Sequence, residues 1–260
     1  MLQHAWKLPL LDRLMHSDPA EIAYSASEDL HWGYFDSREE AETALRPGKN
    51  VIAHENDNTD SINIDSGLSA HSFDYPAMFF LQKLVKKGKL RTITDLVGRS
   101  GSKYICYRKY IDFPSDLIWQ IVARPALRLD REQLSLTNGG TLRFHESVED
   151  TKPCNALICS GTLPYLDIPF EQLLRNLPAM PAVIIINEVS VAEKAGFYML
   201  ETLGSSQILH KAMALPEIEQ IRKNLGYRLV SRWDIPERSF VLGSLNGSAT
   251  VKMIGEAWSL

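Results

Sequence analysis

The strongest constraint on the fold is a series of five short apolar runs separated by helical patterns. The runs cover residues 92–97, 117–122, 141–144, 156–159 and 182–186, and the last is almost entirely Val and Ile. Apolar, β-branched runs of this length suit strands that helices bury on both faces. Strands that alternate with helices form parallel sheets with crossover connections. The sequence therefore predicts an α/β domain with a Rossmann-like, mainly parallel sheet.

The last third of the chain predicts a helix followed by antiparallel strands. Residues 216–225 are helical in pattern and end at Gly226. Asn246-Gly247 is a typical hairpin turn, so residues 239–245 and 250–254 are expected to pair. The predicted sheet is therefore parallel at first and antiparallel in its C-terminal strands.

The N-terminal part differs in pattern from the rest. Up to about residue 49 it predicts helical pieces, and Ser37 is placed to cap one of them. Residues 55–72 are rich in Asn, Asp, Ser and Gly, which indicates an exposed loop. We expect residues 1–74 to form a helical cap and loop on a core of residues 75–260, in one compact domain.

Composition excludes several function classes. A formal net charge of −4 supplies no basic face for nucleic acid or anionic membranes, so a small-molecule or protein partner is expected. The three cysteines lack disulfide or zinc-site spacing, and no metal is expected. Charged residues interrupt residues 1–15, which argues against a signal peptide, and no apolar stretch is long enough to span a bilayer. These features predict a cytoplasmic protein.

Ligands of open parallel sheets bind beyond the carboxyl ends of the strands. Residues 95–104 follow the first run as Asp-Leu-Val-Gly-Arg-Ser-Gly-Ser-Lys-Tyr, in which Gly98 and Gly101 permit a tight turn and a close backbone approach. Ala123 follows the second run, where nucleotide sites usually have an acidic residue. The glycines alone are equally consistent with a simple strand-to-helix turn.

The other three strand ends are also polar. The third run is followed by His145, Glu146 and Ser147, the fourth by Ser160-Gly161, and the fifth by Asn187-Glu188. These groups could line a binding site, or they could simply mark where each strand reaches the surface.

Five collinear segments resemble one family. They are residues 32–41 (Trp-Gly-Tyr-Phe-Asp-Ser-Arg-Glu-Glu-Ala), 75–76 (Tyr-Pro), 95–104, 160–166 (Ser-Gly-Thr-Leu-Pro-Tyr-Leu) and 226–229 (Gly-Tyr-Arg-Leu). In this order they resemble class I S-adenosylmethionine-dependent methyltransferases. Within that class the chain is most similar to small bacterial methyltransferases associated with surface-polysaccharide and natural-product gene clusters.

The chain departs from that family at two cofactor positions, and also at the tip of the fifth strand, where it has Asn187-Glu188 in place of an Arg or similar group, which suggests a different substrate. Val97 stands where the first loop glycine is expected, and Ala123 stands where an acidic residue would bind the ribose hydroxyls. Loss of a carboxylate that accepts two hydrogen bonds from the ribose weakens the free energy of cofactor binding by about 1.5–3 kcal/mol. This corresponds to roughly a tenfold to hundredfold lower affinity for the cofactor.

The resemblance implies S-adenosylmethionine as cofactor and a methyl acceptor that is a small molecule, a saccharide or a natural-product intermediate. Acid–base candidates for a hydroxyl acceptor are His145, Glu188 and His210. The cofactor-binding residues it implies are Asp95, Gly98, Gly101, Tyr104, Ala123, Glu146, Ser147, Ser160 and Gly161. The acceptor-pocket residues are Tyr34, Tyr75, Tyr165, Asn187 and Tyr198, and residues 55–72 and 193–215 are expected to close over them.

Two alternatives remain at the level of sequence. The chain could be a non-catalytic relative that serves as a partner subunit in a biosynthetic pathway, as Val97 and Ala123 suggest. It could also be an enzyme of the same fold that catalyses a different transfer reaction. A nicotinamide dehydrogenase fits less well because the GxGxxG pattern is missing, and no phosphate-binding Gly-Lys-Ser/Thr loop is present.

Overall fold

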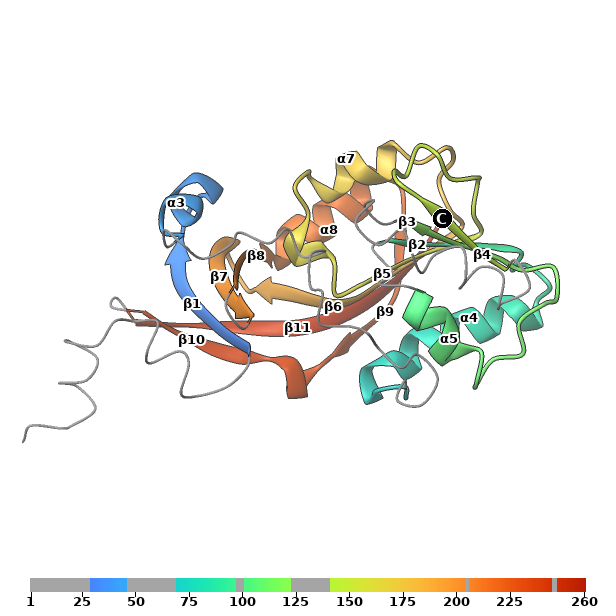
Figure 1. The fold of residues 1–260 in the computed structure, drawn as a ribbon, viewed down its shortest axis with the longest axis horizontal. Helices are drawn as coiled ribbons and strands as arrows, with labels where there is room; N and C mark the ends of the chain where they lie inside the picture. The colour runs from blue at the N-terminus through green and yellow to red at the C-terminus, as the bar shows by residue number, and fades with distance from the viewer. Residues whose placement is uncertain (1–28, 46–68, 97–100, 123–140, 204–205, 245–246) are drawn as a thin grey trace, which may run out of the picture.

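The computed structural model describes residues 29–45, 69–96, 101–122, 141–203, 206–244 and 247–260 (Figure 1). Val97, Gly98, Ala123 and most of the expected loop at residues 55–72 lie outside these ranges.

The five apolar runs form five parallel strands, as predicted. They are β2 (Thr92–Leu96), β3 (Ile118–Val122), β4 (Leu142–His145), β5 (Ala156–Ser160) and β6 (Val183–Ala192). Their order across the sheet is β4-β3-β2-β5-β6, and each neighbouring pair is parallel. The order along the chain reverses between β2 and β5, which makes this the topological switch point of the sheet.

The C-terminal strands complete the same sheet. β11 (Gly247–Ser259) pairs antiparallel with β6, and β9 (Arg228–Asp234) pairs antiparallel with β11. β10 (Phe240–Ser244) pairs with the first half of β11, which confirms the predicted hairpin strands. The core order is therefore β4-β3-β2-β5-β6-β11-β9, a mainly parallel sheet with an antiparallel C-terminal strand inserted, as expected for the class I methyltransferase fold.

Helices cover both faces of this sheet (Figure 1). α4 (Tyr75–Lys86) and α5 (Ser102–Tyr107) lie on one face, and α7 (Phe170–Arg175) and α8 (Leu215–Asn224) lie on the other. Successive residues of a strand point to opposite faces. Ile185 of β6 packs with α4 and α5, whereas Ile184 and Ile186 pack with α7 and α8.

Three further strands extend the sheet beyond the end of β6. β7 (Phe197–Leu203) and β8 (Ser206–Ala214) form an antiparallel pair, and β1 (Asp29–Phe35) adds to β7. β8 joins the last residues of β6 in parallel. Figure 1 shows this extension at the end of the molecule opposite α4 and α5, together with α3 (Arg38–Thr43). Three short 3-10 turns complete the described elements: η1 (Ser72–Asp74), η4 (Leu163–Tyr165) and η5 (Pro236–Arg238).

Two expectations from sequence are corrected here. Residues 29–35 form a strand, not a helical piece, because they pair with β7 along an edge that sequence periodicity does not reveal. Most of residues 193–215 form the β7–β8 pair within the sheet, not a loop that closes over a pocket. The dipeptide Gly204-Ser205 between two alternating runs is the hairpin signal that could have predicted this pair.

Other details agree with the sequence. The Ser37 hydroxyl accepts a hydrogen bond from the Glu40 N–H at 3.2 Å, which caps α3 as predicted. α4 ends just before Gly88, whose φ is +63°. All three cysteines are free. Among the described residues, no helix is long and apolar enough to cross a membrane.

The central position of β6 gives a stability prediction. Ile185 is fully buried in β6, so Ile185→Ala is expected to lower the free energy of unfolding by about 2–5 kcal/mol through lost burial and the cavity left behind. Val241→Ala on β10, where the side chain is 66% exposed, is the matched control and should change it by less than about 0.5 kcal/mol. Urea unfolding followed by circular dichroism measures both, and equal losses would contradict the described packing.

Candidate functional site

Polar side chains gather at the carboxyl edge of the parallel sheet, beside the switch point between β2 and β5. We call this group the strand-end network and define it as Asp74, Lys103, Ser160, Asn187 and Glu188. Ser160 ends β5, Asn187 and Glu188 interrupt the aliphatic run of β6, and Lys103 lies in α5 directly after β2. A site at this edge is where open α/β sheets bind ligands.

Lys103 connects the two carboxylates of the network. Its Nζ lies 2.7 Å from Asp74 Oδ1 and 3.5 Å from Glu188 Oε2. Asp74 Oδ1 also accepts a hydrogen bond from the Tyr107 hydroxyl at 2.8 Å. Burial opposes the charge of Lys103, but the carboxylates of Glu188 and Asp74 outweigh it, and the pKa of Lys103 is raised. The ammonium group therefore stays charged in a largely buried position.

Ser160 and Asn187 continue the network across β5 and β6. The Ser160 hydroxyl donates to Glu188 Oε2 at 2.9 Å, and Asn187 Nδ2 donates to Ser160 Oγ at 3.4 Å. Asn187 Oδ1 accepts from Trp233 Nε1 at 3.0 Å, so the network reaches β9. The Gly161 N–H donates to the Asn187 carbonyl at 2.9 Å, which fixes the backbone at the tip of β5.

A β-bulge directs Asn187 and Glu188 into this network. In the β6–β11 register, Val189 faces Ile254 and Ile186 faces Glu256, so two residues of β6 lie opposite Gly255 alone. Glu188 has a φ of +54°, in the left-handed region that costs an ordinary residue of order 1–3 kcal/mol. Bulges re-aim side chains next to functional sites. The bulge explains why both polar residues are available at one edge.

Asp95 lies beneath the network, within the sheet. Its side chain is buried, and Oδ2 accepts a hydrogen bond from Trp119 Nε1 at 3.2 Å. Burial raises the pKa of Asp95 to about 7, against the opposing effects of the Trp119 hydrogen bond and the Lys103 charge. At neutral pH this carboxyl group therefore divides between its protonated and ionised forms.

Gly101 and Tyr104 lie between the strand-end network and the core, at the start of α5 and within it. Gly101 has a φ of +76°, and a Cβ there would lie 3.0 Å from Leu142 Cδ1 and 3.1 Å from Ile121 Cδ1. The glycine therefore allows the chain to turn closely over the sheet. Tyr104 points into the core, with its ring centroid 5.6 Å from that of Trp119.

His145, the last residue of β4, and the residues that follow it lie at the same edge of the sheet. His145 is half-buried, its Nε2 has no hydrogen-bond partner among the described residues, and burial lowers its pKa. The Ser147 hydroxyl donates to Asp150 Oδ2 at 3.0 Å, and Glu146 is exposed beside it. The cofactor and acid–base roles of these residues stay predictions.

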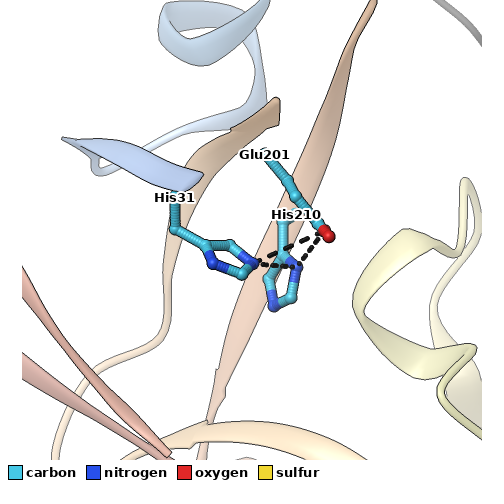
Figure 2. Close-up of side chains that lie close together, drawn as sticks. All are labelled: His31, Glu201 and His210. Carbon is cyan, nitrogen blue, oxygen red and sulfur yellow. Dashed lines mark hydrogen bonds and ion pairs between the residues drawn. The ribbon is translucent and has the colours of Figure 1, made fainter. Parts of the chain in front are cut away.

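A second polar cluster lies where the strand extension meets the end of β6. Glu201 Oε2 lies 3.1 Å from His210 Nδ1 and 3.5 Å from His31 Nε2, and the two ring nitrogens are 3.3 Å apart (Figure 2). Tyr165 donates its hydroxyl proton to Glu201 Oε2 at 2.5 Å, and His210 Nε2 lies 2.7 Å from Ser190 Oγ. We call these five residues the histidine cluster.

Burial and hydrogen bonding act in opposite directions on the acid of this cluster. Burial disfavours the charge of Glu201, but the hydrogen bonds from His210 and His31 outweigh it and lower the pKa of Glu201. Burial lowers the pKa of His210 in spite of the nearby carboxylate. The cluster therefore holds an ionised carboxylate next to a neutral imidazole.

The structure brings together only some of the predicted pocket residues. Tyr165 meets the acid–base candidate His210 in the histidine cluster, and Asn187 joins the strand-end network. Tyr34 is exposed and stacks on Phe197 at 4.4 Å. Two other tyrosines lie apart: Tyr75 is exposed at the start of α4, and Tyr198 is half-exposed on β7.

Several site residues were missed from sequence. Lys103 lies within residues 95–104, the predicted cofactor segment, two residues after Gly101. Its position there is a signal from which a site residue could have been predicted. His31, Glu201 and Ser190 gave no such signal, because they meet only through the pairing of strands far apart in the chain.

Comparison with known proteins gives distant likenesses. No family model and no curated protein sequence matches the chain. The Burkholderia thailandensis 1,6-didemethyltoxoflavin-N1-methyltransferase, solved with S-adenosylhomocysteine, is 15% identical over 71% of this chain and 78% of its own, with a TM-score of 0.47. A Clostridium acetobutylicum S-adenosylmethionine-dependent methyltransferase is 14% identical over 73% and 92%, with a TM-score of 0.44. An amino pentose methyltransferase of Micromonospora echinaspora is 9% identical over 72% and 92%, with a TM-score of 0.41. At this distance the fold assignment rests on the strand order alone.

The buried carboxyl group of Asp95 gives a pH prediction. Because its pKa is about 7 in the folded state and near 3.8 when exposed, the folded protein binds a proton that the unfolded chain has released between about pH 4 and pH 7. Stability therefore falls as pH rises through this window. Asp95→Asn cannot ionise, so relative to wild type it should gain stability from pH 4 to pH 8, by at most about 4 kcal/mol.

Urea unfolding at a series of pH values measures this effect. Asp116→Asn is the matched control, since that carboxylate is exposed and ion-paired with Arg91 at 3.0 Å. A wild-type pH dependence that Asp95→Asn leaves unchanged would rule out a raised pKa at this position.

Proposed function

We propose that this protein is a cytoplasmic S-adenosylmethionine-dependent methyltransferase whose acceptor is a small molecule, a saccharide or a natural-product intermediate. The observation that carries the proposal is the position of the strand-end network. It lies at the carboxyl edge of β2, β5 and β6, beside the switch point of a sheet ordered β4-β3-β2-β5-β6-β11-β9.

The charges of the network fit the proposed cofactor. S-adenosylmethionine carries a positive sulfonium and an amino-acid end with one ammonium and one carboxylate. The network offers carboxylates from Asp74 and Glu188 and an ammonium from Lys103, all largely buried. Ser160 and Asn187 add neutral donors and acceptors to the same group. Mixed charges of this kind complement a zwitterionic ligand better than a purely anionic one.

The bound cofactor would supply an electrophilic methyl group, and the chain would position the acceptor for in-line attack. Alignment of this kind can lower a barrier by about 7–11 kcal/mol. For a hydroxyl acceptor, a base must take up the proton that the acceptor loses. Glu188 belongs to the strand-end network and is the best placed of the three candidates; His145 lies on the β4 side, and His210 lies in the separate histidine cluster.

A non-catalytic partner subunit is the competing function, and one feature favours it. Lys103 is paired with both Asp74 and Glu188 in the described structure, so the charged members of the network already bind one another, with one net negative charge among the three. A site of this kind can be purely structural.

Binding of S-adenosylhomocysteine tests the proposal without knowledge of the acceptor. We expect calorimetric titration of the full-length protein to show one site with micromolar affinity. Ser160→Phe places a bulky ring at the tip of β5 and should weaken binding at least about tenfold, which corresponds to about 1.4 kcal/mol. Ser115→Phe is the matched control, because Ser115 is exposed before β3 at the opposite edge of the sheet, and it should bind as wild type does.

The titration distinguishes the methyltransferase from its two alternatives. No binding by folded wild-type protein at millimolar ligand would overturn the proposal and favour the partner subunit. Binding that both Phe variants retain equally would place the ligand away from the carboxyl edge. Binding without methyl transfer to any tested acceptor class would favour another transfer reaction on this fold.

A further inference from the structure

Strand register brings three metal-binding residue types to one face of the strand extension. His31 on β1 lies directly opposite Glu201 on β7. His210 on β8 lies opposite Met199, two residues from Glu201 and therefore on the same face of β7. Cross-strand and diagonal neighbours on one face are within reach of each other's side chains. Figure 2 shows the three side chains converging from these strands.

The separations of the three ligand atoms match a four-coordinate metal. The distances are 3.3 Å between the histidine nitrogens, 3.1 Å from His210 Nδ1 to Glu201 Oε2, and 3.5 Å from His31 Nε2 to Glu201 Oε2. Zinc–nitrogen and zinc–oxygen bonds of about 2.0–2.1 Å place tetrahedral ligands about 3.3–3.4 Å apart. Adjacent ligands of an octahedral ion with the same bond lengths would lie about 2.8–3.0 Å apart. The observed triangle is closer to the tetrahedral spacing.

Neighbouring side chains prepare His210 Nδ1 to act as a ligand. Ser190 Oγ lies 2.7 Å from His210 Nε2 and 3.0 Å from Met253 Sδ, so in the metal-bound form it can accept the Nε2 proton while its own hydroxyl proton points to the sulfur. A neutral imidazole protonated at Nε2 presents a lone pair at Nδ1. Metal-bound histidines are oriented in this way by a hydrogen bond to the other ring nitrogen.

The carboxylate of Glu201 gives the cluster a negative charge that a cation would neutralise. Glu201 Oε2 accepts a hydrogen bond from Tyr165 at 2.5 Å, and His210 Nδ1 and His31 Nε2 lie beside it at 3.1 Å and 3.5 Å. In the metal-bound form, the lone pairs of these two ring nitrogens and of Glu201 Oε2 would all point at the ion.

His31 is the most exposed of the three ligands. The His210 and Glu201 side chains are 3% and 9% exposed, but that of His31 is 13% exposed and stacks on Phe240 with its centroid 4.2 Å away. Three protein ligands with one position left open are typical of zinc sites that bind water or a substrate.

We propose that His31, Glu201 and His210 bind a divalent transition-metal ion, best matched by Zn²⁺, with a fourth coordination position left for water or a ligand. This site is separate from the strand-end network and does not depend on methyl transfer. The sequence predicted no metal, because the three ligands come from strands that pair only in the folded chain.

Metal titration of chelator-treated, full-length protein tests the site. We expect one equivalent of Zn²⁺ to bind by calorimetry, and Co²⁺ in its place to give the intense visible absorption of a tetrahedral ion. Glu201→Gln keeps the shape of the side chain and should weaken binding at least about a hundredfold. Ser190→Ala keeps all three metal ligands but removes the hydrogen bonds of Ser190 to His210 and Met253, and it should weaken metal binding about 10–100-fold. His145→Gln, at a half-buried histidine on β4, is the matched control and should bind as wild type does.

The outcomes separate the metal site from a hydrogen-bonded cluster. Absence of stoichiometric Zn²⁺ binding by the wild type, or equal binding by Glu201→Gln and wild type, would overturn the proposal. Weak, octahedral Co²⁺ absorption would overturn the four-coordinate geometry. Circular dichroism checks that each variant folds. Should Glu201→Gln fail to fold, His31→Gln on the outer strand β1 replaces it with the same expected loss.

Discussion

The arrangement of the whole molecule depends on the pairing of one buried strand, β6. It pairs with β5 on one side and β11 on the other, and its last two residues pair with β8. Its aliphatic residues are buried by helices on both faces, so a shift of one residue would turn each side chain to the wrong layer. This strand therefore joins the parallel core to the strand extension in a fixed register.

The same strand supplies both polar clusters. Asn187 and Glu188 belong to the strand-end network, and Ser190 orients His210 in the histidine cluster. The bulge opposite Gly255 interrupts the aliphatic run of β6 and turns Asn187 and Glu188 toward one edge. The strain at Glu188 is held in place by the strong pairing on either side of it.

Local sequence signals predicted much of the fold. The parallel strands were predictable because runs such as residues 182–186 are apolar throughout, and α3 because Ser37 is an efficient cap. β1 and the β7–β8 pair were missed because their residues mix polar and apolar types, and their burial comes from partners distant in sequence. Ser160, Asn187 and Glu188 could be placed at one edge from topology alone. Their bonds to Lys103, and the meeting of His31 with Glu201, depend on side-chain packing and register that periodicity does not encode.

The close packing of Trp233 over Gly255 has a consequence for which sequences this fold can accept. A Cβ at position 255 would overlap the Trp233 indole, whose N–H holds Asn187 in place. A side chain added at this position on β11 would therefore displace Trp233 on β9. Through the hydrogen bonds of that tryptophan, it would also disturb Asn187 on β6 and Ser160 on β5. Position 255 should admit glycine alone for as long as position 233 keeps its indole, so the two positions are expected to vary together or not at all.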